Sequence, residues 1–287
     1  MHSYFKNLEA KKEFERLYFK KINLLGIPYE MQHIETSFGD TNVITTGSAQ
    51  KPSLVLLHDS NSCAPVALEM IQRLADHFKI YAIDIPGHPN LSAEVRLNQN
   101  DQSYGKWMFE ILSRLQIENA TLLGISFGGF ICLKALVFDE KRIKRTFLIF
   151  PDGIIKSNPL KEFWKVCLPI KMYQWKRKAK YLQQYQAALF SEEDLFVFEF
   201  LSKVILDYDM DFSQVRIFQK AEISQIKSPI YLVAGENDLN NPGKILIQDA
   251  RKKFPTLKET LLIKGSKKVP DFDGVQQIID LVLKNQI

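Results

Sequence analysis

The feature that most constrains the fold is a short apolar run that recurs along the chain. Runs of this kind lie at residues 53–57, 80–83, 121–123, 146–150, 230–233 and 260–263. Strands buried on both faces have this composition, because helices cover both sides of a parallel sheet. Helix-length segments separate most of the runs, at residues 65–78, 102–115, 127–139 and 242–254. The alternation predicts an α/β fold with a mostly parallel central sheet flanked by helices.

Two segments depart from this alternation. Residues 29–46 alternate apolar and polar side chains around a central turn, which predicts an antiparallel hairpin at the start of the sheet. Between residues 150 and 229 the sequence is helical, aromatic and charged, without a comparable apolar run. We therefore expect residues 151–228 to form a helical cap over the carboxyl edge of the sheet, where ligands bind in open α/β folds. Residues 1–150 and 229–287 would form the core.

The sharpest local motif is a G-x-S-x-G sequence made by Gly124, Ser126 and Gly128. It lies between a predicted strand and a predicted helix, which is the context of a nucleophile elbow. Such a turn presents the serine hydroxyl at the edge of the sheet, and the backbone N–H of Phe127 would face a developing oxyanion. The alternative is a turn whose serine only caps a helix. The flanking pattern favours the elbow.

Composition and cysteine spacing argue against several classes of protein, among them nucleic-acid-binding, disulfide-rich, metal-binding and membrane-spanning proteins. Lys and Arg outnumber Asp and Glu by 38 to 33 in 287 residues, and nothing else in the chain supports nucleic-acid binding. The cysteines Cys63, Cys132 and Cys167 are widely spaced, so we expect no disulfide framework, no metal site and no cofactor. No apolar run reaches the roughly 18 residues of a membrane span, and the first residues do not resemble a signal peptide. The expected location is the cytoplasm.

With these motifs in order, the chain resembles the α/β-hydrolase superfamily, and within it the small bacterial carboxylesterases of the carboxylesterase NP group. The matching stretches are residues 26–30, 54–58, 84–88, the elbow at 124–129, and 232–238. The elbow is specific, whereas the other stretches are persuasive through their order along the chain. The resemblance implies a serine hydrolase that acts on a small apolar ester.

The resemblance also implies roles for individual residues. Ser60 would supply the second oxyanion-hole N–H, beside that of Phe127. The family usually has glycine directly after the histidine that ends the third strand, and here Asp59 replaces it. A carboxylate at that place would oppose an oxyanion unless it turns away. Asp238 falls at the position of the triad acid, with Asp152 as a less favoured substitute, and His88 falls in a loop where the family's histidine is structural.

The departure from the family concerns the general base. The family expects a histidine shortly after the last strand, and Lys268 stands at that position, with no histidine after His88. A lysine has an ordinary pKa of about 10.4, and a neighbouring carboxylate raises it. We therefore expect an ion pair between Asp238 and Lys268 beside an unactivated Ser126. A triad enzyme without its base loses roughly six orders of magnitude in turnover.

The predicted cap is rich in cations and aromatic rings. Eight basic residues and one acid lie between positions 156 and 180, with aromatic side chains among them. The basic residues are Lys156, Lys161, Lys165, Lys171, Lys176, Arg177, Lys178 and Lys180. This pattern fits a membrane-surface helix, a nucleic-acid face, or a lid over an acidic, apolar ligand. It fits equally well a solvated helix whose aromatic side chains pack inward.

Two functional hypotheses follow from the residues. The first is a carboxylesterase-type serine hydrolase with a degenerate triad of Ser126, Asp238 and Lys268, an oxyanion hole of Ser60 and Phe127, and weak activity. The second is a catalytically inactive protein that keeps the hydrolase pocket and binds a small apolar or carboxylate-bearing ligand. In the second case, Lys268 would be the counter-ion of the ligand.

Overall fold

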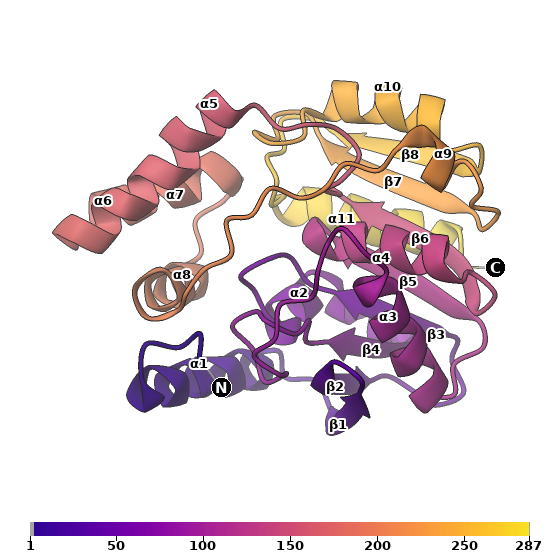
Figure 1. The fold of residues 1–287 in the computed structure, drawn as a ribbon, viewed down its shortest axis with the longest axis horizontal. Helices are drawn as coiled ribbons and strands as arrows, with labels where there is room; N and C mark the ends of the chain where they lie inside the picture. Colours follow the sequence, from indigo (N-terminus) through magenta and orange to yellow (C-terminus); the bar gives the residue numbers. More distant parts are fainter. Residues whose placement is uncertain (1–2, 287) are drawn as a thin grey trace.

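The computed structural model describes residues 3–286, and an eight-stranded sheet runs through its centre (Figure 1). Its strands are β1 (Glu30–Thr36), β2 (Gly39–Thr46), β3 (Ser53–Leu57), β4 (Lys79–Ile83), β5 (Ala120–Ile125), β6 (Ile143–Ile149), β7 (Ile230–Gly235) and β8 (Leu257–Ile263). Their order in the sheet is β1-β2-β4-β3-β5-β6-β7-β8. The strand β2 pairs antiparallel with β1 and β4, and the other neighbours are parallel. This arrangement confirms the predicted α/β fold with its initial hairpin.

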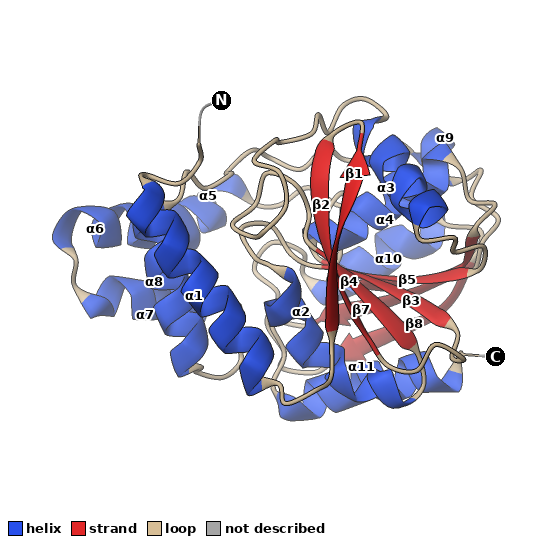
Figure 2. Cartoon of the chain, turned by 90° about the horizontal axis from the view of Figure 1, so that it is seen from below, coloured by secondary structure: helices blue, strands red, loops and turns tan. Residues whose placement is uncertain are grey.

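Helices cover both faces of the sheet (Figure 2). They are α1 (Leu8–Leu24), α2 (Ala64–Ile71), α3 (Ser103–Arg114), α4 (Phe127–Phe138), α5 (Pro159–Glu162), α6 (Leu168–Lys176), α7 (Ala179–Leu189), α8 (Leu195–Asp207), α9 (Lys220–Ile223), α10 (Gly243–Lys253) and α11 (Phe272–Lys284). One apolar core lies between the sheet and α1, α2 and α11. The second lies between the sheet and α3, α4 and α10. The two cores explain why the central strands are apolar on both faces.

The predicted boundaries differ from the observed ones mainly at three elements. The helix expected at residues 65–78 ends at Ile71 and continues as a 3-10 turn, Gln72–Asp76. The strands β6 and β8 each begin three residues before the predicted runs, because their first residues include the charged side chains of Lys144 and Arg145 in β6 and Lys258 in β8. Charged residues at a strand end are poor signals for a buried strand, so the apolar pattern finds only its centre.

Between β6 and β7 the chain forms α5 to α9 and no strand of the main sheet. A π turn, Phe163–Cys167, joins α5 to α6, so that residues 159–176 form one helical run. The helix α8 lies beside α1 in both views (Figures 1 and 2). Glu199 of α8 pairs there with Lys20 and Arg16 of α1, at 2.6 and 3.2 Å. The N-terminal helix therefore supports the helices that follow β6.

The topology gathers polar side chains at one edge of the sheet. Asp59, Ser126, Asp152, Asp238 and Lys268 each follow the carboxyl end of a different strand: β3, β5, β6, β7 and β8. These strands are parallel neighbours, so their carboxyl ends meet at the same edge. In an open α/β sheet this edge is where ligands bind.

Candidate functional site

Ser126 lies in the tight turn between β5 and α4. Its backbone has φ +51° and ψ −108°, a region that non-glycine residues rarely adopt and that costs about 1–3 kcal/mol. The flanking glycines are required by close contacts. A Cβ on Gly124 would lie 2.4 Å from the carbonyl oxygen of Gly128, and one on Gly128 would lie 2.3 Å from that of Leu57. The turn has the strained geometry of a nucleophile elbow, and the side chain of Ser126 is buried.

The hydroxyl of Ser126 has a carboxylate as its partner. Its Oγ donates a hydrogen bond of 2.7 Å to Oδ2 of Asp152, which follows β6. The other oxygen, Oδ1, accepts a hydrogen bond of 2.9 Å from the side-chain amide of Asn241. The sequence predicts Asp152 only as a less favoured substitute for the triad acid, although its position just after β6 is a usable signal. Asn241 lies in the loop after β7, and no sequence motif pointed to it.

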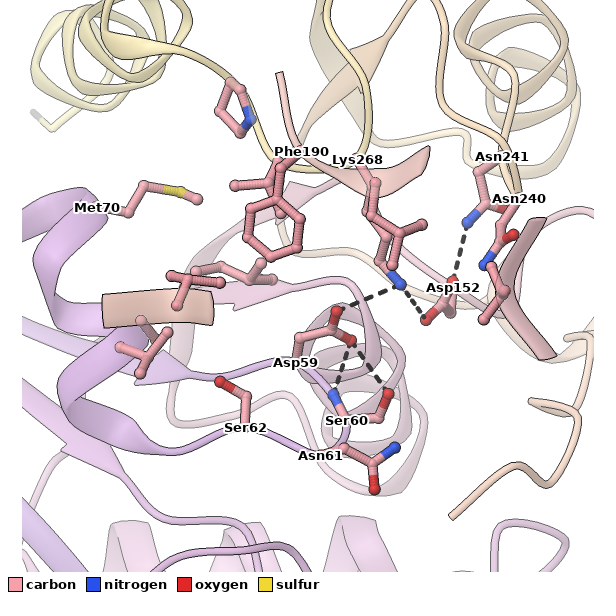
Figure 3. Close-up of a pocket in the computed structure, with 18 of the residues that line it drawn as sticks. Asp59, Ser60, Asn61, Ser62, Met70, Asp152, Phe190, Asn240, Asn241 and Lys268 are labelled. Atoms are coloured by element: carbon pink, nitrogen blue, oxygen red, sulfur yellow. Dashed lines mark hydrogen bonds and ion pairs between the residues drawn. The ribbon is translucent and has the colours of Figure 1, made fainter. Parts of the chain in front are cut away.

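Lys268 lies between the carboxylates of Asp59 and Asp152, as Figure 3 shows. Its Nζ is 3.3 Å from Oδ2 of Asp59 and 3.9 Å from Oδ2 of Asp152, and its side chain is only 10% exposed. Burial by itself lowers the pKa of Lys268, but the charges of Asp152, Asp59 and Asp238 outweigh burial and raise the pKa above its ordinary value. The side chain is therefore an ammonium ion, which donates hydrogen bonds and accepts none.

Asp59 points toward the elbow. Its Oδ1 accepts hydrogen bonds from the backbone N–H groups of Ser60, at 2.7 Å, and Phe127, at 3.3 Å. These are the two donors that the resemblance assigns to the oxyanion hole. The carboxylate does not turn away from them: one oxygen occupies both donors and the other faces Lys268.

Two buried histidines hold the turn that carries Asp59. His58 donates through Nδ1 to the carbonyl oxygen of Asp59, at 2.6 Å, while its Nε2 accepts from the backbone N–H of Ile85. His88 accepts through Nδ1 from the backbone N–H of Asn61, at 3.0 Å. Burial lowers the pKa of both histidines, so both imidazoles are neutral. They serve as fixed hydrogen-bonding partners of the backbone.

Asp238 is not paired with Lys268, and the expectation of that ion pair is wrong. Its Oδ1 accepts from the backbone N–H groups of Asn240 and Asn241, at 2.8 and 3.1 Å, and the residue is 3% exposed. Its Oδ2 is buried without a hydrogen-bond partner among the described residues. Burial raises the pKa of Asp238, although the nearby charge of Lys268 opposes this effect. The ammonium of Lys268 instead lies against the two carboxylates that flank Ser126.

The site opens into a cavity of about 960 Å³. Its apolar wall comes from α2, from α8 and from the end of α7, through side chains such as Met70, Phe200 and Phe190, which directly follows α7. Its polar end is formed by Asp59, Asp152, Lys268, Asn240 and Asn241 (Figure 3). Among the described residues, no group of three or more His, Cys, Asp or Glu side chains is placed to hold a metal ion.

The family model described as "alpha/beta hydrolase fold" matches residues 52–214, more than half of the chain. Carboxylesterase YbfK of Bacillus subtilis is 29% identical over 156 residues, which are 54% of this chain and 53% of that protein. A second Bacillus subtilis relative, described as an uncharacterized carboxylesterase nap, is 27% identical over 138 residues, 48% of this chain and 46% of the relative. The matched part of the chain therefore spans about half the length of these curated relatives.

Two crystal structures of Bacillus subtilis proteins share the fold along nearly the whole chain. That of carboxylesterase CesB (YbfK) has a TM-score of 0.83 at 21% identity, covering 96% of this chain and 98% of that one. That of naproxen esterase (carboxylesterase NP) has a TM-score of 0.84 at 20% identity, covering 98% and 100%. At this level of identity the likeness concerns the fold.

Proposed function

Because the chain belongs to the alpha/beta hydrolase fold family, we propose that it is a ligand-binding relative of the carboxylesterases in which ester hydrolysis at Ser126 is very slow or absent. The observation that carries this proposal is the set of charges around the serine hydroxyl. The hydroxyl donates to Asp152, and the cation Lys268 stands where the resemblance requires a neutral imidazole.

Acylation of a serine requires a group that takes the hydroxyl proton and later delivers it to the leaving group. Lys268 cannot take this proton, because its neighbouring carboxylates keep it protonated. Asp152 accepts the hydrogen bond, but its carboxylate also accepts from Asn241 and lies 3.9 Å from the ammonium of Lys268, so it is a weak base toward an alcohol. In this arrangement the serine hydroxyl has an acceptor and lacks an effective base.

The oxyanion hole adds a second barrier. A tetrahedral intermediate would need the N–H groups of Ser60 and Phe127, and Asp59 already accepts from both. An ester could reach these donors only after the carboxylate had moved out, and the displaced negative charge would remain close to the developing oxyanion. One lost oxyanion donor costs about 10²–10³ in turnover, so occupation of both donors strongly disfavours hydrolysis.

The cavity supports binding of a small apolar molecule. Its wall is largely apolar, and α7 and α8 of the segment after β6 form part of it; we therefore propose that residues 151–228 act as a cap over the core. Nine described lining residues are Asp or Glu and four are Lys or Arg. This acidic balance favours a neutral apolar ligand, such as an ester or alcohol, over a carboxylate-bearing one.

Weak ester hydrolysis remains the second candidate, and one observation favours it. Ser126 keeps the strained elbow backbone, and Asp238 keeps a buried oxygen without a partner among the described residues. In an intact triad, the imidazole of the general base donates to the acid at such an oxygen. The site therefore retains two parts of a triad around a changed third member.

Turnover of short-chain p-nitrophenyl esters by the wild-type protein and by Ser126→Ala separates the two candidates. We expect equal rates for both proteins, and no labelling of Ser126 by a fluorophosphonate probe under conditions that label an active serine esterase. Slow turnover that Ser126→Ala abolishes would support the second candidate. Turnover at ordinary esterase rates that depends on Ser126 would overturn the proposal.

Binding is tested separately, with 1-naphthyl butyrate as the probe and unfolding temperature as the readout. We expect the ester to raise the unfolding temperature of the wild-type protein and of Ser126→Ala alike. Replacement of Ala67, a buried residue of α2 that lines the cavity, by Phe should abolish this rise. An unchanged unfolding temperature for the wild-type protein would contradict ligand binding in the cavity.

We also propose that the protein works in a reducing compartment such as the cytoplasm. Its three cysteines are free, and Cys63 and Cys132 are buried, which is typical of proteins that do not rely on disulfides. Among residues 3–286, no helix combines the length and apolarity that a membrane span requires.

A further inference from the structure

The helical run of residues 159–176 carries large apolar side chains that point into solvent. Trp164 is 61% exposed and Trp175 is 75% exposed, while Leu160 and Phe163 are 71% and 44% exposed. Tryptophan side chains are mostly buried in folded proteins, so two exposed ones about three turns apart on one helical run need a reason. In Figure 1 this run, α5 and α6, lies at the outer end of the molecule, away from the sheet.

Cations surround these apolar side chains. The exposed basic residues of this segment are Lys156, Lys161, Lys165, Lys171, Lys176, Arg177, Lys178 and Lys180. The ion pairs formed among residues 3–286 involve other lysines and arginines. The acid within this stretch, Glu162, accepts a hydrogen bond from Ser157. The positive charge of the segment is therefore directed to solvent.

We propose that residues 156–180 dock the protein on an anionic lipid surface. Lysines and arginines next to a membrane are attracted to acidic headgroups, and tryptophan rings settle at the boundary between headgroups and acyl chains. The cations of residues 156–180 would meet the headgroups, and the exposed apolar side chains of the same segment would enter the interface. The phosphates of a nucleic acid would also attract these cations, but they offer no hydrocarbon region for Leu160, Trp164 and Trp175.

The opposite side of the same run faces the cavity. Val166 and Glu162 line the cavity, together with Lys156 and Ser157. A protein docked through Trp164 and Trp175 would therefore hold one wall of its cavity at the lipid surface, where apolar molecules concentrate. Docking itself requires neither the ligand nor Ser126.

Sedimentation with lipid vesicles tests the proposal on the full chain. We expect the wild-type protein to bind vesicles that contain phosphatidylglycerol far more strongly than vesicles of phosphatidylcholine alone. Binding should weaken as salt rises from about 0.1 to 1 M, because the screening length falls from about 10 to about 3 Å. Brominated acyl chains in the anionic vesicles should quench the tryptophan fluorescence, since Trp164 and Trp175 would insert whereas Trp107 is buried in the core.

Two variants with a matched control locate the surface. Lys161, Lys165, Lys171 and Lys176 changed together to Gln should weaken binding by ~10-fold or more, and so should Trp164→Ala with Trp175→Ala. The control changes four exposed lysines at the amino edge of the sheet to Gln: Lys144, Lys227, Lys252 and Lys258. It has the same net charge as the first variant and should bind nearly as well as the wild type.

Three results would overturn the proposal. The first is equal loss of binding in the charge variant and its control, which would indicate attraction by net charge alone. The second is the absence of quenching by brominated lipid. The third is binding to RNA or heparin without binding to anionic vesicles, which would identify a polyanion as the partner of this segment.

Discussion

The ammonium of Lys268 lies 3.3 Å from the carboxylate of Asp59, and the same carboxylate accepts from the N–H groups of the elbow. Under the proposed function, these two residues stand in place of a neutral base and an empty oxyanion hole, the two parts of the site that a serine hydrolase needs most. The charge of Asp59 helps to raise the pKa of Lys268 and to keep it protonated. Lys268 and Asp59 are therefore coupled by their charges. A substitution at one of the two positions leaves the other residue, and its effect on the serine, in the site.

Restoring hydrolysis should require both positions. Lys268→His alone would supply an imidazole that can donate to the unpartnered Oδ2 of Asp238, but Asp59 would still occupy the oxyanion donors. Asp59→Gly alone would free the donors and leave the cation. We expect each single variant to stay near the wild-type rate with p-nitrophenyl butyrate, and the double variant to exceed both by about 10²-fold or more.

The control for this cycle is Ser126→Ala in the double variant, which should return the rate to the wild-type level. A single Lys268→His variant that reaches the rate of the double variant would show that Asp59 moves out of the oxyanion hole without cost. The effects of the Asp59 and Lys268 substitutions on turnover would then not be coupled.

Removal of the cation should destabilise the fold. In Lys268→Met, the carboxylates of Asp59 and Asp152 would face each other without a counter-ion, and a broken buried ion pair costs about 3–5 kcal/mol. Urea unfolding at neutral pH measures the free energy of unfolding. Because the pKa of Lys268 is raised on folding, its contribution is complete below the ordinary lysine pKa of about 10.4 and is lost only as the pH rises beyond it.

Lys244→Met is the matched control, because Lys244 pairs with Glu236 at 3.0 Å but its side chain is 74% exposed. An exposed pair contributes about 0–1 kcal/mol. Equal losses in the two variants would contradict the central position of Lys268. Asp59→Asn combined with Lys268→Met should recover part of the lost free energy, since one uncompensated charge is removed.

Asp238 should make stability depend on pH in the acidic range. Burial raises the pKa of Asp238 in the folded state, so between the unfolded and folded pKa values the folded state binds more protons and stability falls as pH rises. Asp238→Asn removes this titration. The free energy of unfolding of the variant minus that of the wild type should therefore increase as pH rises from about 3.9, then level off. A difference that decreases over this range would indicate that the folded-state pKa is lowered.

The backbone strain at Ser126 should be visible in stability as well. Glycine adopts φ +51° without a Cβ penalty, whereas alanine keeps the penalty, and both lose the hydrogen bond to Asp152. We expect the free energy of unfolding of Ser126→Gly to exceed that of Ser126→Ala by about 1 kcal/mol. Thermal unfolding of the two variants in parallel gives the comparison. Equal stabilities would place the elbow in an unstrained conformation.

Much of the architecture could be predicted because it depends on local patterns. The apolar runs located the parallel strands, and the glycines around Ser126 located the elbow, since their spacing is dictated by backbone contacts. The same patterns placed Asp238 and Lys268 just after strands β7 and β8. The prediction failed at the level of partners, where Lys268 meets Asp59 and Asp152 in place of Asp238.

The sequence by itself determined the order of the strands' apolar runs, the elbow, and the absence of a histidine after His88, because these are properties of neighbouring residues and of composition. Only the tertiary structure decided that Asp59 occupies the donors of Ser60 and Phe127. That contact depends on the turn held by His58 and His88 and on the position of Lys268, which lies 268 − 59 = 209 residues after Asp59 in the chain. Side chains from distant strands meet within 3–4 Å only after the sheet is assembled, and differences of that size decide which charges pair.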